Sequence, residues 1–139
     1  MQKQNKIEAL YDFFNKGCPL IQDGVLGVDY LGPNATEYSI NTILNASPVI
    51  EKYTDGGALK QYPFYFQSIE RYTEDAADNI LNSGFYEKLE AWIRKQDEVG
   101  NLPEIEGIQS IEAVSNGFIY DTSEDLAMYQ IQCRILYIE

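Results

Sequence analysis

The first periodic pattern of apolar residues predicts a short α-helix near the start of the chain. Four apolar side chains recur at the i, i+3, i+4 and i+7 spacing that places them on one helical face: Ile7, Leu10, Tyr11 and Phe14. Asn5 is suited to cap the first turn, and Gly17 is suited to end the helix. A helix this short needs the rest of the fold to stabilise it.

Alternating patterns follow and predict strands. Residues 18–37 contain material for one short strand broken up by glycines, and residues 37–44 alternate cleanly. Residues 49–53, a turn at 54–57 and a long alternating run over 58–72 predict a β-hairpin with one long strand. Pro63 has no N–H to donate to a ladder, so it indicates a sheet edge or a bulge at that point.

A second helix is predicted from residue 73 to residue 99. Thr73 is a suitable N-cap, and the Ser83–Gly84 pair predicts an interruption of the helix. The apolar spacing then resumes with a face that includes Trp92, which we expect in the core, and Gly100 followed by Pro103 predicts the end.

The pattern in the last third of the chain predicts strands. Residues 108–114 and 118–120 flank Asn116–Gly117, a dipeptide that predicts a tight hairpin turn. A polar turn precedes a final strand over 127–138, whose alternation implies one buried and one wetter face.

The order of helix, strands, long helix and strands predicts an α+β fold with a largely antiparallel sheet and helices packed on one side. The length of 139 residues favours a single domain over 1–139, and the sequence shows no internal repeat or linker.

Composition argues against an enzyme. The chain has no His, which is the commonest general base and metal ligand, and Cys18 and Cys133 form no CxxC pair. We therefore expect neither a metal nor a cofactor, and no catalytic residues. No phosphate-binding loop and no nucleophile elbow are present. No signal peptide and no membrane-spanning stretch are visible in the sequence.

The net charge of −12 argues against direct nucleic-acid binding and against an anionic membrane surface, because both need clustered Lys and Arg. The negative charge either keeps the protein soluble or forms an acidic face for a basic partner.

Eleven Tyr and six Phe are more aromatic residues than a small core requires, and aromatic side chains are enriched at protein interfaces. The run 61–66 puts aromatic residues on both sides of one strand. A helix of the same chain or a neighbouring subunit could cover the second side, and the sequence leaves both open.

Several segments resemble the tail-terminator and minor capsid proteins of phages and prophages of Firmicutes. The similar segments, together with Trp92, are EKYTDGG (51–57), QYPF (61–64), NSGFYEK (82–88), GNLP (100–103), DTSED (121–125) and YQIQCR (129–134). Some members of this family carry a chloramphenicol-resistance label. An acetyltransferase of that kind depends on a catalytic His, and this chain has none, so we reject that label.

The resemblance implies a tail-terminator-like fold and a structural role in virion assembly. It implies a hexameric ring of identical subunits that caps the tail tube and contacts the tail tube protein and the head connector proteins. The protein would then act in the bacterial host cytoplasm during assembly and later in the virion, at the head–tail junction. An acidic lumen would let DNA pass without binding.

Loops and strand edges are the candidate subunit interface under this hypothesis, because a ring requires head-to-tail contacts. The candidates are Asp55, Gly56, Gly57, Tyr62, Phe64, Asn116 and Gly117. Turn geometry and core packing are the alternative interpretation of each. A head–tail connector or tail-completion protein remains an alternative function, as does a small-molecule binding module with an apolar cavity.

Overall fold

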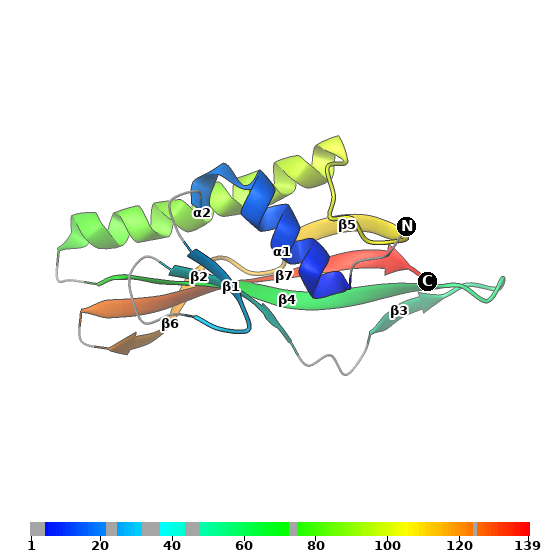
Figure 1. Ribbon diagram of the computed structural model, residues 1–139, viewed down its shortest axis with the longest axis horizontal. Helices are drawn as coiled ribbons and strands as arrows, with labels where there is room; N and C mark the ends of the chain where they lie inside the picture. The colour runs from blue at the N-terminus through cyan, green and yellow to red at the C-terminus, as the bar shows by residue number, and fades with distance from the viewer. Residues whose placement is uncertain (1–4, 22–24, 32–36, 44–47, 73–74, 124) are drawn as a thin grey trace.

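Two helices and seven strands, counted over the residues that the structure describes, make up an α+β fold (Figure 1). The computed structural model describes residues 5–21, 25–31, 37–43, 48–72, 75–123 and 125–139. The elements, in chain order, are α1 (Lys6–Gly17), a 3₁₀ turn (Pro19–Ile21), β1 (Val25–Val28), β2 (Glu37–Thr42), β3 (Val49–Lys52), β4 (Ala58–Arg71), α2 (Ala76–Val99), β5 (Ile108–Ala113), β6 (Phe118–Ser123) and β7 (Leu126–Ile138).

The first helix forms as its pattern predicts. The Asn5 side chain accepts a hydrogen bond from the Glu8 N–H at 2.8 Å, and the helix ends at Gly17. Leu10 and Phe14 on its apolar face are fully buried. The predicted cap, face and end of this helix are all confirmed.

The two longest strands, β4 and β7, run antiparallel and form the spine of the sheet. They pair from Leu59 opposite Ile138 to Arg71 opposite Leu126. The path through the sheet is β1-β2-β4-β7-β5, with β3 also on β4 and β6 also on β7. Among the described strands only β1 and β2 pair in parallel, so the prediction of a largely antiparallel sheet is confirmed.

Each spine strand is flanked by two short strands that follow one another along its outer edge. The strands β2 and β3 both run antiparallel to β4, and β5 and β6 both run antiparallel to β7. Each half of the chain therefore supplies a helix, a broken strand and a long strand, in that order, with β1 as an addition to the first half. The order of elements repeats although the sequence shows no repeat.

Pro63 lies at the break in the first of these flanking strands. On that side, β4 pairs with β3 as far as Lys60 and with β2 from Phe64 onward. A residue without an N–H is tolerated where the neighbouring strand is interrupted. The interior strand β4 is thus an edge only locally, and the expected hairpin of β3 and β4 is confirmed.

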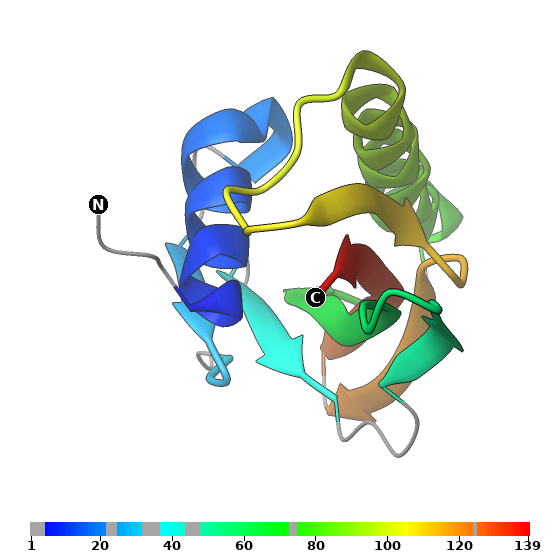
Figure 2. The same cartoon turned by 90° about the vertical axis from the view of Figure 1, so that its right-hand side faces the viewer.

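Both helices cover the same face of the sheet (Figures 1 and 2). Helix α1 lies over β1 and β2, and α2 lies over β5. Phe14 is at the centre of the aromatic core, with its ring centroid 5.7 Å from that of Phe66 and 5.6 Å from that of Trp92. Trp92 is half-buried against this core.

The predicted interruption of the second helix is wrong. Helix α2 is continuous from Ala76 to Val99, and Gly84 lies inside it. A glycine costs about 1 kcal/mol in a helix interior, and burial of Tyr86, Leu89 and Ile93 outweighs that cost.

The two ends of α2 are defined by local chemistry. Asp75 caps the helix by accepting from the Ala77 N–H at 2.9 Å, whereas the predicted cap, Thr73, lies outside the described residues. Gly100 ends the helix in a left-handed conformation, as predicted.

The predicted hairpin turn at Asn116–Gly117 is also wrong. The strands β5 and β6 pair with β7 and not with each other, so this dipeptide marks a break in an edge strand. The chain stays beside β7 across the break, because the Val114 N–H donates to the Gln132 carbonyl at 2.8 Å. The hairpin turn comes later, between β6 and β7.

Candidate interaction surfaces

The turn between β3 and β4 contains three of the predicted interface residues. The Asp55 carboxylate accepts from the Gly57 N–H at 2.9 Å, and the Gly57 carbonyl accepts from the Tyr53 N–H at 2.8 Å. Gly56 has a φ of 96°, which glycine adopts without steric cost. These three residues have a clear role in turn geometry, and Asp55 and Gly56 are also exposed.

A shallow hollow of about 510 Å³ adjoins this turn. Its lining includes Gly56 and Gly57 together with Val49, Lys52, Tyr53, Ala58, Lys60 and Glu139. The Lys60 ammonium lies 2.9 Å from the Glu139 carboxylate, and this contact lowers the pKa of Glu139 and raises that of Lys60. Lys52 is exposed and takes part in no ion pair within the described parts of the chain. We call this the β3 hollow.

Tyr62 and Phe64 lie on the helix-covered side of β4, Tyr62 in the local gap between β3 and β2 and Phe64 where β2 pairs with β4. Phe64 is fully buried, with its ring 6.1 Å from that of Phe14, so its side chain belongs to the core. The prediction that Phe64 contributes to a subunit interface is wrong, because its side chain is not accessible at the surface. Tyr62 is half-buried against the same core, and this burial raises the pKa of its hydroxyl.

The opposite side of β4 is partly covered by this chain itself. The Tyr120 hydroxyl donates to the Gln67 side-chain carbonyl at 2.5 Å, so the Tyr120 side chain extends over that face although β6 itself pairs with β7. On the same face the Arg134 guanidinium contacts Glu112 at 2.5 Å and Gln61 at 3.1 Å. A polar network therefore occupies the side that the aromatic run left open.

Asn116 and Gly117 lie in the break between β5 and β6, directly beneath α2. A Cβ at position 117 would lie within 3.0 Å of the Cβ, Cγ and Cδ1 atoms of Tyr86. Only glycine allows the backbone to come this close to the helix. Gly117 is therefore required for packing within the chain, and Asn116 is exposed beside it.

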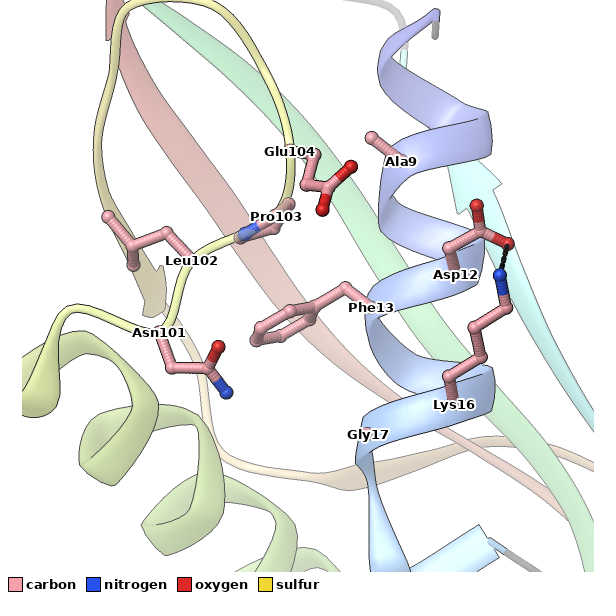
Figure 3. Close-up of a pocket in the computed structure, with 9 residues that line it drawn as sticks. All are labelled: Ala9, Asp12, Phe13, Lys16, Gly17, Asn101, Leu102, Pro103 and Glu104. Atoms are coloured by element: carbon pink, nitrogen blue, oxygen red, sulfur yellow. Dashed lines mark ion pairs between the residues drawn. The ribbon is translucent and has the colours of Figure 1, made fainter.

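A second hollow, of about 310 Å³, lies between α1 and the loop that follows α2 (Figure 3). Phe13 extends from α1 toward this loop, and Asp12 and Lys16 pair on the helix at 3.7 Å. Asn101 and Glu104 come from the loop side. The rim is charged on both sides, which differs from the apolar cavity that a small-molecule binding module would present.

The strand β6 is a surface that the sequence analysis did not single out. Every residue in it is exposed, and the apolar Phe118, Ile119 and Tyr120 are 39%, 40% and 43% exposed. The strand β3 is exposed in the same way, with Val49 at 36% and Ile50 at 44%. Successive side chains of a strand point to opposite faces, so three consecutive apolar residues cannot all face one core. The run Phe118–Tyr120 was therefore the sequence signal that this strand exposes apolar side chains.

Charge is distributed unevenly along the chain. Residues 96–133 contain no Lys or Arg and eight acidic residues: Asp97, Glu98, Glu104, Glu106, Glu112, Asp121, Glu124 and Asp125. This stretch includes the whole of β6, so the exposed apolar residues of that strand lie in a purely acidic sequence context.

The two thiols are buried. Burial raises the pKa of Cys133 far above its ordinary value and also raises that of Cys18. A thiol in such a site stays protonated, and the thiol is far less nucleophilic than the thiolate. Within the described ranges, no group of three or more Cys, Asp or Glu side chains is arranged to hold a metal ion.

Neither of the helices is long and apolar enough, over the part of the chain that the structure describes, to cross a membrane. Comparison of the chain with known protein families and with curated proteins gives no match.

Proposed function

We propose that this chain is a structural protein of phage or prophage virion assembly, of the tail-terminator type. In this role, copies of the chain form a ring that caps the tail tube and contributes to head–tail joining. The tail tube protein and the head connector proteins are its partners in the proposal. A head–tail connector or tail-completion protein with the same mode of assembly is the alternative.

The observation that carries the proposal is the pair of exposed apolar strands at opposite ends of the sheet. The strands β3 and β6 lie far apart along the molecule (Figure 1) and each exposes large apolar side chains. Apolar side chains on two separate strands of one chain favour contacts with two neighbouring molecules. A head-to-tail contact of this kind generates a ring when its rotation closes.

The segments that resemble tail terminators support the same assignment. Segments 51–57 and 61–64 form the hairpin of β3 and β4, and segments 121–125 and 129–134 belong to the hairpin of β6 and β7. Segment 82–88 lies in α2 and segment 100–103 follows it. Four of the six segments thus lie in the two hairpins that carry the exposed strands.

The test is the solution mass of the purified chain, measured by light scattering over a concentration series, with negative-stain images of the largest species. A single large species with a closed outline supports the proposal, and six chains of 15.9 kDa amount to about 95 kDa. A monomer at every concentration would contradict self-assembly in solution.

A further inference from the structure

The two exposed strands occupy equivalent positions in the two halves of the fold. Each is the second piece of a broken strand and leads through a turn into a spine strand: β3 into β4, and β6 into β7. Figure 1 shows them at opposite ends of the sheet. One chain therefore presents two similar strands that cannot reach each other.

The charged side chains available for contact differ between the two strands. β3 contains both Glu51 and Lys52, but only Lys52 lines the β3 hollow, where it has no ion pair among the described residues; Lys60 in the same hollow is paired with Glu139. β6 contains Asp121, and Asp125 follows in the turn; both are exposed and neither has an ion pair there. Opposite charges at the two ends of one chain favour contact between unlike ends.

A second copy of this chain supplies both of the properties that the β6 strand requires of a partner. It offers apolar side chains, Val49 and Ile50, to cover Phe118 and Ile119, and it offers the Lys52 ammonium to meet an acidic side chain of β6. A two-fold symmetric contact between two β6 strands would instead place that acidic side chain near its own copy, and like charges repel.

The contact is made by side chains and not by a continuous backbone ladder. The pairing of β3 with β4 shifts register between Val49 and Glu51, and that of β6 with β7 shifts between Ile119 and Asp121. Bulges of this kind twist an edge and oppose strand addition. The β3 hollow, at about 510 Å³, is of the size that binding pockets have, so it can receive projecting side chains.

We propose that the hairpin of β6 and β7 in one copy docks onto β3 and the β3 hollow of the next copy, with Asp121 facing Lys52. The apolar residues Phe118, Ile119 and Tyr120 are covered by this contact. The inference rests on the proposed function and specifies which surfaces join the subunits. Because the two surfaces are different, every copy contacts one neighbour through its β6–β7 hairpin and another through its β3 hollow. The copies are therefore joined head to tail.

The test is a charge reversal on each surface, read out by light scattering at about 0.15 M salt, where exposed charges interact over roughly 8 Å. Lys52→Glu and Asp121→Lys are each expected to weaken self-association about tenfold or more, because each places like charges in the contact. An equimolar mixture of the two variants restores assembly. The carboxylate introduced on β3 of one variant meets the ammonium introduced on β6 of the other, while the native pair forms at the alternate contact.

Matched controls separate the contact from net charge. Lys88→Glu and Glu87→Lys change the net charge by the same amounts at exposed positions on α2, outside β3, β6 and the lining of the β3 hollow, and are expected to leave assembly unchanged. Circular dichroism checks that all four variants fold.

The outcomes distinguish failure of the docking from failure of the proposed function. Loss with each single variant, recovery in the mixture and intact controls support the docking. If the wild-type chain assembles and the single variants assemble equally well, the docking is wrong and the proposed function stands. The docking is also wrong if the mixture fails to recover or if the controls lose assembly. A wild-type chain that remains monomeric contradicts both.

Discussion

Replacement of Gly117 by alanine tests the packing of α2 against the sheet. The added Cβ would lie within 3.0 Å of three Tyr86 atoms, and these belong to the base of the side chain and the near edge of its ring. Tyr86 is 2% exposed, and its ring stacks on that of Tyr129 at 5.6 Å. The ring therefore has no free volume into which to rotate, and either the helix or the 114–117 segment has to move.

The magnitude follows from two costs and one opposing gain. Overpacking in a well-packed interior costs about 1–3 kcal/mol. Movement of Tyr86 also disturbs its 2.5 Å hydrogen bond to Ser68, and a buried hydrogen bond contributes about 1 kcal/mol. Alanine recovers about 0.4–1 kcal/mol by reducing the entropy of the unfolded chain. We expect Gly117→Ala to lower the free energy of unfolding by about 1–3 kcal/mol.

The assay is urea unfolding followed by far-ultraviolet circular dichroism, with a lower midpoint and an unchanged m-value as the expected result. Gly84→Ala is the matched control, because no atom outside the backbone of its own helix lies within 4 Å of the Cβ it would add. Since Gly84 lies inside a helix, alanine there should raise the free energy of unfolding by about 1 kcal/mol. The reasoning would be refuted if Gly117→Ala were as stable as the wild type.

Three further predictions concern buried or half-buried groups and use the same urea assay. Tyr86→Phe leaves the buried Ser68 hydroxyl without this partner and should cost about 1–3 kcal/mol, and Ser68→Ala in the same background should recover part of the loss. Asp97→Ala removes the carboxylate that accepts from the Ile111 N–H at 3.1 Å, with an expected loss of about 1 kcal/mol. Burial raises the pKa values of Cys133 and Tyr86, so the folded chain keeps protons that the unfolded chain releases above about pH 9. Stability should therefore be unaffected by these groups at neutral pH and fall as pH rises past 9, and a thiol-reactive dye should label Cys133 only after unfolding.

Elements fixed by local chemistry were predictable from the sequence. Helix α1 has its capping residue, apolar face and terminating glycine within thirteen residues, so its bounds could be predicted from local sequence although its stability depends on the rest of the fold. The long strand β4 was equally clear, because its fourteen residues are rich in aromatic and β-branched or aliphatic side chains without a helical spacing, and a turn precedes them. Both predictions depend on residues that are neighbours in the sequence.

The role of a single glycine was not predictable. Asn116–Gly117 has the residue types of a tight turn, but glycine serves equally well where a helix presses on the backbone. Which of these applies depends on Tyr86, thirty-one positions earlier in the chain and brought close only by the fold. Gly84 was predicted to interrupt the second helix, but the helix is continuous. A helix stabilised by tertiary packing tolerates a glycine that would weaken the same helix in isolation.

The structure places only some of the candidate interface residues at the surface. Asp55 and Gly56 are exposed at the end of a hairpin, but Phe64 belongs to the core, because alternation alone does not say which side of a strand the helices cover. The exposed β6 strand was overlooked because Phe118 and Ile119 were interpreted as the second strand of a hairpin that does not form.

The repeated order of elements explains why both exposed strands exist. In each half, the strand that flanks the spine is broken, and its second piece pairs with the spine on one side and with no other described strand. A chain that needed only a stable core could make such an outer piece polar, and β3 and β6 instead expose five large apolar side chains between them. Lys52 in the β3 hollow and Asp121 on β6 give these equivalent positions one pair of opposite charges, although β3 also contains Glu51. Complementary surfaces on the two halves of one chain favour an assembly in which each copy contacts the next through unlike ends.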